Sequence, residues 1–515
     1  RQIDDNFSKN VFNSYIKGLD NQRRFFLQSD IDNFTKYRYK IDDLIKNSDI
    51  SFFDLTIEKL FQRTSQVNSF YRELLAKPFD FSKEEFINLD FDNLSYSRTL
   101  NDLKKRWRMR FKLSALQIYY DKKQEENDKK AKDSMYQIKS DIALEIEARE
   151  SVIENVDIFF ENVSQLERKD WFTVFVNSIA LEFDPHTSYY APQEKDRFDT
   201  RISGKFEGIG ARLQRKNEQV HIIEIIPGGP VWRDNLLKVG EIILKVAQKD
   251  EDPIEIGNMR LDDAVNLIKG PKGTKVYLTV KKVDGIIEEV EIIRDVVELE
   301  ESYAKSSLII KDSNKYGLIE LPQFYIDFDD YSNRNAAIDV KKEINQLKEK
   351  DVQGIIIDLR NNGGGSLKTV VDITGYFIKD GPVVQVKSTG GRKEILRDND
   401  SSIIWEGPLV ILVNEFSASA SEILAAALQD YKRAIVLGSK QTFGKGTVQN
   451  MVDLNRIISG STYGDLGAVK LTTDKFYRIN GGSTQLEGVK SDVVILDRYS
   501  YIDLGEKDQE NPLSW

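Results

Sequence analysis

Residues 408–430, PLVILVNEFSASASEILAAALQD, pass from a short apolar run through a serine-rich turn into a run rich in alanine and leucine. The first run has the length of a buried strand, and the second has that of a helix. Residues 354–365, GIIIDLRNNGGG, repeat the pattern of a strand that ends in a turn, and we expect a helix over 366–378. Strands that alternate with helices predict a largely parallel sheet covered by helices, with ligands at the carboxyl ends of the strands.

The first 200 residues are predicted to be helical and highly charged. Leu103, Trp107 and Phe111 recur at a spacing of four, which places them on one face of a helix. Residues 121–133, DKKQEENDKKAKD, are nearly all charged. They predict a solvated loop or the frayed end of a helix.

Residues 204–297 have a different pattern, in which short β-rich runs such as FEGIGARLQ and VGEIILKV alternate with turns. The pattern predicts a small, partly open barrel with one or two helices. Because GIGA is followed by PGGP and VGEIILKV, the segment resembles a PDZ domain, which binds peptide C-termini as an added strand. The resemblance assigns carboxylate binding to Gly208, Ile209, Gly210 and Ala211, although the two glycines could also serve only a tight turn.

Composition excludes several classes of function. The chain has 515 residues, with 74 Lys and Arg against 84 Asp and Glu, for a net charge of −10. An acidic chain is not expected to bind nucleic acid. The absence of cysteine excludes disulfides and thiolate metal sites, and two histidines argue against a multi-histidine metal site. We expect no membrane span, because no apolar run approaches 18 residues.

Familiar catalytic motifs do not fit. The run GSKQTFGKGT has five residues between Gly438 and Gly444, where a phosphate-binding loop needs four. HExxH and GxSxG are both missing from the sequence, and no pair of carboxylates is singled out by its spacing. We therefore expect no metal, nucleotide or other cofactor.

A serine-rich turn, a glycine turn and a lysine between glycines remain as candidates. A serine hydroxyl needs an adjacent base, and a lysine made neutral by burial can serve in place of histidine. Backbone N–H groups of a glycine turn and of a helix N-terminus could bind an oxyanion. Alternatively, the small residues only cap a helix and allow close packing on the sheet.

Five separated motifs carry a resemblance to a known family. They are DPHTSYYAP, MRLDDAVNLIKGPKGT, DLRNNGGG, NEFSASASEILAAALQDY with TFGKGTVQ, and KFYRINGGSTQLEGV. Together they resemble the tail-specific branch of the C-terminal-processing serine proteases, from about residue 160 to the end and more loosely before it.

The resemblance implies a catalytic role for three side chains. Ser419 matches the nucleophile, Lys445 the general base and Gln449 the group that orients the lysine. Ser419 and Lys445 are separated by 445 − 419 = 26 residues, one more than is usual in the family. The additional residue falls near 439–441, which we expect to be a surface loop.

The oxyanion donors implied by the resemblance are backbone N–H groups. One belongs to Ala420 and the other to either Gly363 or Gly364, and the sequence does not decide between these two glycines.

The expected fold is a multidomain α/β and α+β chain. Its predicted parts are a helical N-terminal region at 1–200, whose last part at 165–200 packs on the core, a PDZ-like domain at 204–297, an α/β Ser-Lys protease core at 298–497, and a C-terminal tail at 498–515. The family often continues further, so a truncated tail is an expectation.

The resemblance implies an endopeptidase that selects proteins by their C-terminal tails. It also implies a bacterial periplasm or cell envelope after removal of an N-terminal signal, and an envelope lipoprotein as a potential adaptor. Two alternatives are a catalytically silent PDZ scaffold that binds protein C-termini and a carrier of lipid or small apolar molecules. The carrier should have lost the nucleophile, but Ser419 is present.

Overall fold

The computed structural model describes residues 2–327, 330–458 and 464–514. Arg1 and Trp515, the outer ends of the predicted first and last parts, lie outside the described residues. The chain forms two compact units, Arg1–Phe183 and Asp184–Trp515. The four parts expected from the sequence divide the chain more finely than these units, and their boundaries remain predictions.

The first unit is helical, with an aromatic core. Its helices are α1 (Asp5–Leu19), α2 (Gln28–Phe34), α3 (Ile41–Lys46), α4 (Ser51–Leu75), α5 (Leu100–Lys132), α6 (Asp141–Ser164) and α7 (Arg168–Ala180). Tyr15, Phe52 and Phe175 pack edge to face in the interior of the unit. No helix in the described part of the chain is both long and apolar enough to cross a membrane.

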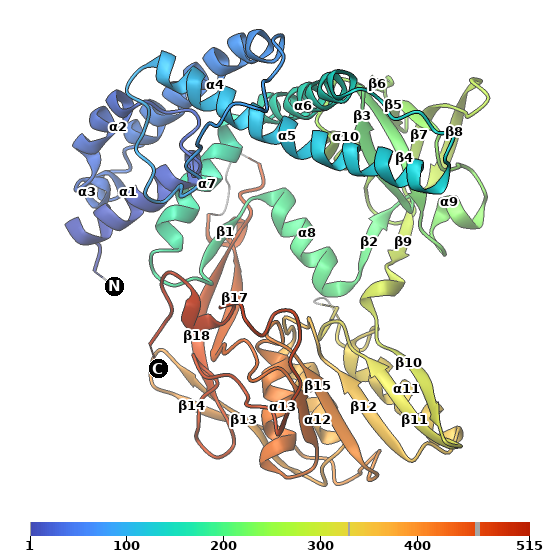
Figure 1. The fold of residues 1–515 in the computed structure, drawn as a ribbon. Helices are drawn as coiled ribbons and strands as arrows, with labels where there is room; N and C mark the ends of the chain where they lie inside the picture. The colour runs from blue at the N-terminus through green and yellow to red at the C-terminus, as the bar shows by residue number, and fades with distance from the viewer. Residues whose placement is uncertain (1, 328–329, 459–463, 515) are drawn as a thin grey trace. The chain divides into compact units, whose positions relative to one another are not determined.

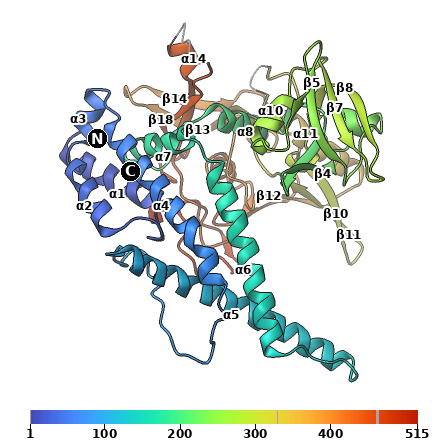
Figure 2. The same cartoon turned by 90° about the horizontal axis from the view of Figure 1, so that it is seen from above.

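Of the two alternatives for 121–133, the loop is wrong: the segment is the largely exposed end of α5, which continues as a regular helix to Lys132. In Figure 2, α5 and α6 lie side by side as they approach the turn that joins them. Glu126 of α5 is buried there and accepts hydrogen bonds from the Tyr136 hydroxyl at 2.8 Å and from the Lys139 N–H at 3.0 Å. These bonds from the turn stabilise a helix end that its charge pattern alone does not favour.

In the second unit, the segment predicted to be PDZ-like forms a small sheet. Its strands lie in the order β3 (Ala211–Lys216), β4 (Gln219–Ile225), β5 (Ile242–Gln248), β7 (Lys275–Lys281) and β8 (Ile287–Ile293), with β6 (Ile254–Glu255) paired to β5. Helix α10 (Leu261–Ile268) buries Ala264 and Ile268 in the same core. β3 lies at one edge of the sheet (Figure 1).

The α/β core contains the largely parallel sheet expected from the alternation of strands and helices. Its strand order is β10 (Lys305–Lys311), β11 (Asn314–Glu320), β12 (Gly354–Asp358), β15 (Leu409–Val413), β16 (Ile435–Gly438) and β19 (Val493–Val494). Only the pair β10–β11 is antiparallel among these described strands. Buried residues of α11 (Ala336–Glu349), α12 (Leu367–Gly375) and α13 (Ala420–Asp430) belong to the same hydrophobic core as this sheet. Figure 1 shows the three helices beside its strands.

A second sheet of the core contributes to the candidate site. Its order is β1 (Ser188–Tyr190), β18 (Ala468–Tyr477), β13 (Gly381–Ser388) and β14 (Lys393–Asp398), and β17 (Thr447–Asp453) also pairs with β18. Two further strands, β2 (Lys205–Gly208) and β9 (Asp295–Glu298), pair with each other where the chain enters and leaves the small sheet. The predicted architecture of a helical N-terminal region, a small strand-rich domain and a mixed α/β core is therefore confirmed.

The close contact between β15 and β16 depends on Gly438. Its φ is +149°, and a Cβ atom there would lie 1.9 Å from the Val413 carbonyl oxygen. We expect Gly438→Ala to lower the free energy of unfolding by about 3 kcal/mol, measured by denaturant unfolding. Gly390→Ala is the control, because a Cβ there meets nothing within 4 Å. Equal stability of the two variants would contradict this account.

Candidate active site

Ser419 lies in a strained turn between β15 and α13. Its φ is +57° and its ψ is −114°, an unusual conformation for a residue with a side chain. Gly364 packs against this turn, and a Cβ atom on Gly364 would lie 2.7 Å from Ser419 Cβ. Glycine at 364 therefore allows the turn that carries Ser419 to approach the turn that follows β12.

The three serines of the motif have different environments. Ser417 and Ser421 are fully buried and donate hydrogen bonds to the carbonyl groups of Leu359 and Asn362, at 2.8 Å and 2.9 Å. Ser419 is the partly exposed member of the set. Two serines thus hold the two turns together, and the third is the one that remains partly accessible.

Hydrogen bonding distinguishes Gly363 from Gly364, the two glycines between which the sequence did not decide as donors to the oxyanion. The Gly364 N–H donates to Asn362 Oδ1 at 2.9 Å. Within the described chain, the N–H groups of Gly363 and Ala420 have no hydrogen-bond acceptor. Ala420 is the first residue of α13, where N–H groups are unpaired within the helix and favour negative charge.

One buried carboxylate connects the serine turn to the lysine loop. Glu422 Oε2 accepts the N–H groups of both Ser419 and Lys445 at 2.9 Å each. Its Oε1 accepts the Gly444 N–H at 2.8 Å and the Thr442 hydroxyl at 2.6 Å. The Phe443 N–H also donates to the Ser417 carbonyl at 3.0 Å. The structure thus brings the segments of Ser419 and Lys445 together.

Burial shifts the pKa values of both Glu422 and Lys445. It raises the pKa of Glu422 to about 7, although the four hydrogen bonds act in the opposite direction. Burial also lowers the pKa of Lys445 to about 8, and the positive charge of Lys470 adds to this effect. A substantial fraction of Lys445 is therefore neutral in mildly alkaline solution.

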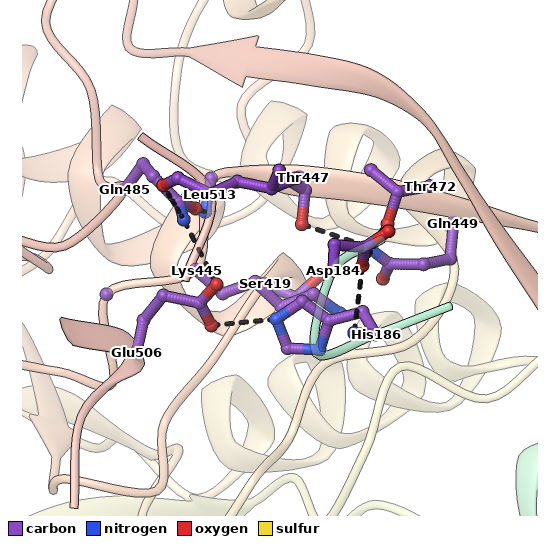
Figure 3. Close-up of polar contacts among 12 residues, drawn as sticks. Asp184, His186, Ser419, Lys445, Thr447, Gln449, Thr472, Gln485, Glu506 and Leu513 are labelled. Atoms are coloured by element: carbon purple, nitrogen blue, oxygen red, sulfur yellow. Dashed lines mark hydrogen bonds and ion pairs between the residues drawn. The ribbon is translucent and has the colours of Figure 1, made fainter. Parts of the chain in front are cut away.

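Gln449 lies on β17, and its amide faces two threonines. Its Nε2 donates to Thr447 Oγ1 at 2.9 Å and to Thr472 Oγ1 at 3.1 Å (Figure 3). No hydrogen bond joins Gln449 to Lys445 among the described residues. Because Nε2 serves the threonines, the amide oxygen of Gln449 is the atom that can accept a hydrogen bond from a lysine.

Three buried residues of the site were missed by the sequence analysis. Glu422 follows Ser419 by three residues, and this S-x-x-E spacing at the start of a helix could have identified it. Gln485 accepts the Gly446 N–H at 2.7 Å, and Glu506 contacts Gln485. Neither has a local sequence signal, because both reach the site from distant segments.

The predicted peptide-binding loop lies at the edge of the small sheet. Gly208 ends β2, Ala211 begins β3, and the buried Ile209 lies between them. Gly210 has φ +83° and packs against Gly229, whose Cα would lie 2.9 Å from an added Cβ. In the part of the chain that the structure describes, the N–H groups of Ile209 and Gly210 have no acceptor.

The acidic groups of the site do not gather as metal ligands do. No group of three or more His, Asp and Glu side chains among the described residues is placed to hold a metal ion.

Three known families match consecutive parts of the chain. Residues 1–193 match the tail specific protease N-terminal domain, 199–281 the PDZ domain and 315–495 the peptidase family S41.

Similar proteins occur in several bacteria. The tail-specific protease of Haemophilus influenzae is 35% identical over 520 residues, which cover 100% of this chain and 70% of that protein. The carboxy-terminal-processing protease of Bartonella bacilliformis is 33% identical over 328 residues, 62% of this chain and 68% of that protein.

Solved structures match in part. The PDZ domain of the carboxy-terminal protease from Vibrio cholerae in complex with a peptide is 41% identical, covering 18% of this chain and 99% of that one, with a TM-score of 0.18. The photosystem II D1 C-terminal processing protease is 23% identical, covering 65% and 86%, with a TM-score of 0.36.

The hydrogen bonds of Glu422 predict a large effect of a neutral substitute. Glu422→Gln places an NH₂ group where a carboxylate oxygen accepts two hydrogen bonds, so those two donors lose their acceptor. We expect the free energy of unfolding to fall by about 2 kcal/mol, measured by denaturant unfolding. The exposed Glu487→Gln is the matched control and should change stability little. An unchanged stability of Glu422→Gln would show that the buried carboxylate does not hold the two segments.

Proposed function

We propose that this chain, which belongs to the tail-specific protease family, is a serine endopeptidase with Ser419 as nucleophile and Lys445 as general base. The observation that carries the assignment is the shared Glu422 Oε2, which binds the backbone of both residues at 2.9 Å. An enzyme with this pair needs the two segments in a fixed relation, because proton transfer requires hydrogen-bond distance.

The chemistry proceeds by acyl transfer. Neutral Lys445 Nζ takes the proton of Ser419 Oγ as this oxygen forms a bond to the peptide carbonyl carbon. The Lys445 ammonium then donates the proton to the leaving amine as the peptide bond breaks. Water, deprotonated by Lys445, attacks the acyl-enzyme and releases the acid product with Ser419 restored.

Two N–H groups are proposed to bind the oxyanion. Those of Gly363 and Ala420 suit this role because neither has another acceptor in the described chain, whereas the Gly364 N–H is already used. Gln449 is proposed to orient Lys445 through its amide oxygen, while Thr447 and Thr472 hold its amide nitrogen.

Substrate selection is proposed to occur at the small sheet. The edge strand β3 is available for addition of an extended peptide, and the N–H groups of Ile209 and Gly210 can bind a terminal carboxylate. This arrangement supports recognition of proteins by their C-terminal tails. The alternative of a silent scaffold is not favoured, because the chain matches peptidase family S41 and retains Ser419 and Lys445.

The place of action is also a proposal. The relatives named above are bacterial proteases, and we propose the periplasm or cell envelope as the compartment. An envelope lipoprotein acting as an adaptor would be consistent with that compartment, and pull-down with purified candidate lipoproteins tests it.

The nucleophile is tested by cleavage of a purified protein that ends in an apolar tail, with EDTA present throughout. We expect Ser419→Ala to lose at least about 10³-fold in cleavage rate while it keeps the wild-type affinity for the tail, measured by fluorescence anisotropy. Ser307→Ala, a serine on β10, is the control and should cleave as the wild type does. Full cleavage by Ser419→Ala, or loss of wild-type cleavage in EDTA, would overturn the mechanism.

The pH dependence follows from the protonation of Lys445. The base works only when neutral, so kcat/KM should rise about tenfold for each pH unit below the pKa of about 8 and level off above it. The measurement is kcat/KM between pH 6 and 9.5 on a tailed substrate. A rate that falls across this range would contradict the role of Lys445 as base.

A further inference from the structure

Glu506 is a fully buried carboxylate that the proposed mechanism does not use. It begins the short 3₁₀ helix η3 (Glu506–Asp508) and is 0% exposed. A buried carboxylate without partners would be strongly destabilising, so its contacts carry information about its role.

The side chain of Glu506 is held at both oxygens. Its Oε2 lies 2.7 Å from His186 Nε2, and its Oε1 accepts a hydrogen bond from Gln485 Nε2 at 3.0 Å. The Glu506 N–H also donates to the Phe443 carbonyl at 2.8 Å. The carboxylate is therefore fixed at both oxygens (Figure 3). The backbone of Glu506 is hydrogen-bonded to the loop that carries Lys445.

Gln485 extends this contact to the other side of the lysine. Its Oε1 accepts the Gly446 N–H at 2.7 Å, while its Nε2 donates to the Leu513 carbonyl at 2.9 Å as well as to Glu506. Phe443 and Gly446 lie on either side of Lys445, so the segment around Glu506 and Leu513 holds the lysine loop at both ends.

His186 connects Glu506 to the second sheet. Asp184 Oδ1 accepts the His186 N–H at 2.8 Å and the Thr472 hydroxyl at 2.9 Å. Thr472 Oγ1 in turn accepts the Gln449 amide at 3.1 Å. A continuous set of contacts thus runs from Glu506 to the residue proposed to orient Lys445.

We propose that Glu506 is a positioning residue for Lys445. The carboxylate of Glu506, held by His186 and Gln485, fixes the loop that carries Lys445 and balances the charge of the Lys445 ammonium. This inference rests on the proposed role of Lys445 as general base. It goes beyond that role because it assigns part of the active site to a segment far from both catalytic motifs in the sequence.

The charges around Lys445 determine in which direction Glu506 shifts the pKa of this lysine. The charged groups that act on it electrostatically are Glu422 from α13, Asp184 from the turn before β1, Lys470 from β18 and Glu506 from η3. Of the three carboxylates, Glu506 has the largest effect in raising the Lys445 pKa. Removal of the Glu506 charge therefore lowers the pKa of Lys445, so that the lysine is neutral at lower pH. It also makes the Lys445 ammonium, which must form during acylation, less stable.

The test measures the protonation of the Lys445 amine directly and does not depend on cleavage of a substrate. Competitive acetylation with trace acetic anhydride modifies only neutral amines, and mass spectrometry of the Lys445 peptide gives its reactivity as a function of pH. The two variants compared, Glu506→Gln and Asp508→Asn, are made in the full chain that also carries Ser419→Ala. Glu506→Gln can keep a hydrogen bond to both Gln485 and His186 while it loses the charge.

We expect Glu506→Gln to move the acetylation midpoint of Lys445 down by about one pH unit, which raises its neutral fraction at pH 7 about fivefold. Asp508→Asn is the matched control, because it removes a charge from the same 3₁₀ helix. Among the described residues, the Asp508 side chain accepts only the Gly505 N–H, at 2.9 Å. The control midpoint should stay at the wild-type value.

An unmoved midpoint in Glu506→Gln, or a shift equal to that of Asp508→Asn, would overturn the proposal. If Glu506→Gln does not fold, Glu506→Met removes the same charge with a side chain of similar length and is judged by the same criterion. With Ser419 present, the acid limb of kcat/KM should move down with the midpoint. Absence of cleavage by the wild type would count against the proposed function and leave the acetylation result to decide on Glu506.

Discussion

The geometry of the candidate active site depends on the carboxylate of Glu422. Its two oxygens accept four hydrogen bonds, and these bind the turn of Ser419 to the loop of Lys445. Buried ionisable groups are tolerated only when their hydrogen bonds are complete, and such a group is costly to rearrange. One side chain therefore fixes the relation between two residues that are far apart in the chain and that we propose to exchange a proton.

The backbone around this carboxylate is adapted to close approach. Ser419 has a positive φ, and the Cα of Gly364 lies where a side chain would collide with Ser419. Glycines also allow the lysine loop to pack closely. Gly444 has a positive φ, and a Cβ on Gly446 would lie 2.8 Å from Gln485 Cβ. Small residues here serve contact between segments, and the strain at Ser419 is sustained by the packed core on which α13 rests.

The sites proposed for recognition and for catalysis lie on different sheets of the same unit. The small sheet presents its edge strand β3, while Ser419 and Lys445 belong to the α/β core. The chain enters and leaves the small sheet through β2 and β9, which pair with each other. Lys205 of β2 forms an ion pair with Asp327 at 2.6 Å, and Arg334 forms one with Glu298 of β9 at 2.6 Å. Both connections are thus tied to the core by charge.

The sequence by itself determined the order of strands and helices and the chemical type of the candidate residues, because hydrophobic periodicity and glycine- or serine-rich turns are local properties. It left 121–133 open between a loop and a helix end, and the helix there is stabilised by the contacts of Glu126 with the following turn. Only the tertiary structure distinguished the N–H of Gly363 from that of Gly364 and brought Glu506 to the lysine loop. These features depend on which distant segments pack together, and burial, hydrogen-bond pairing and charge proximity are properties of that packing.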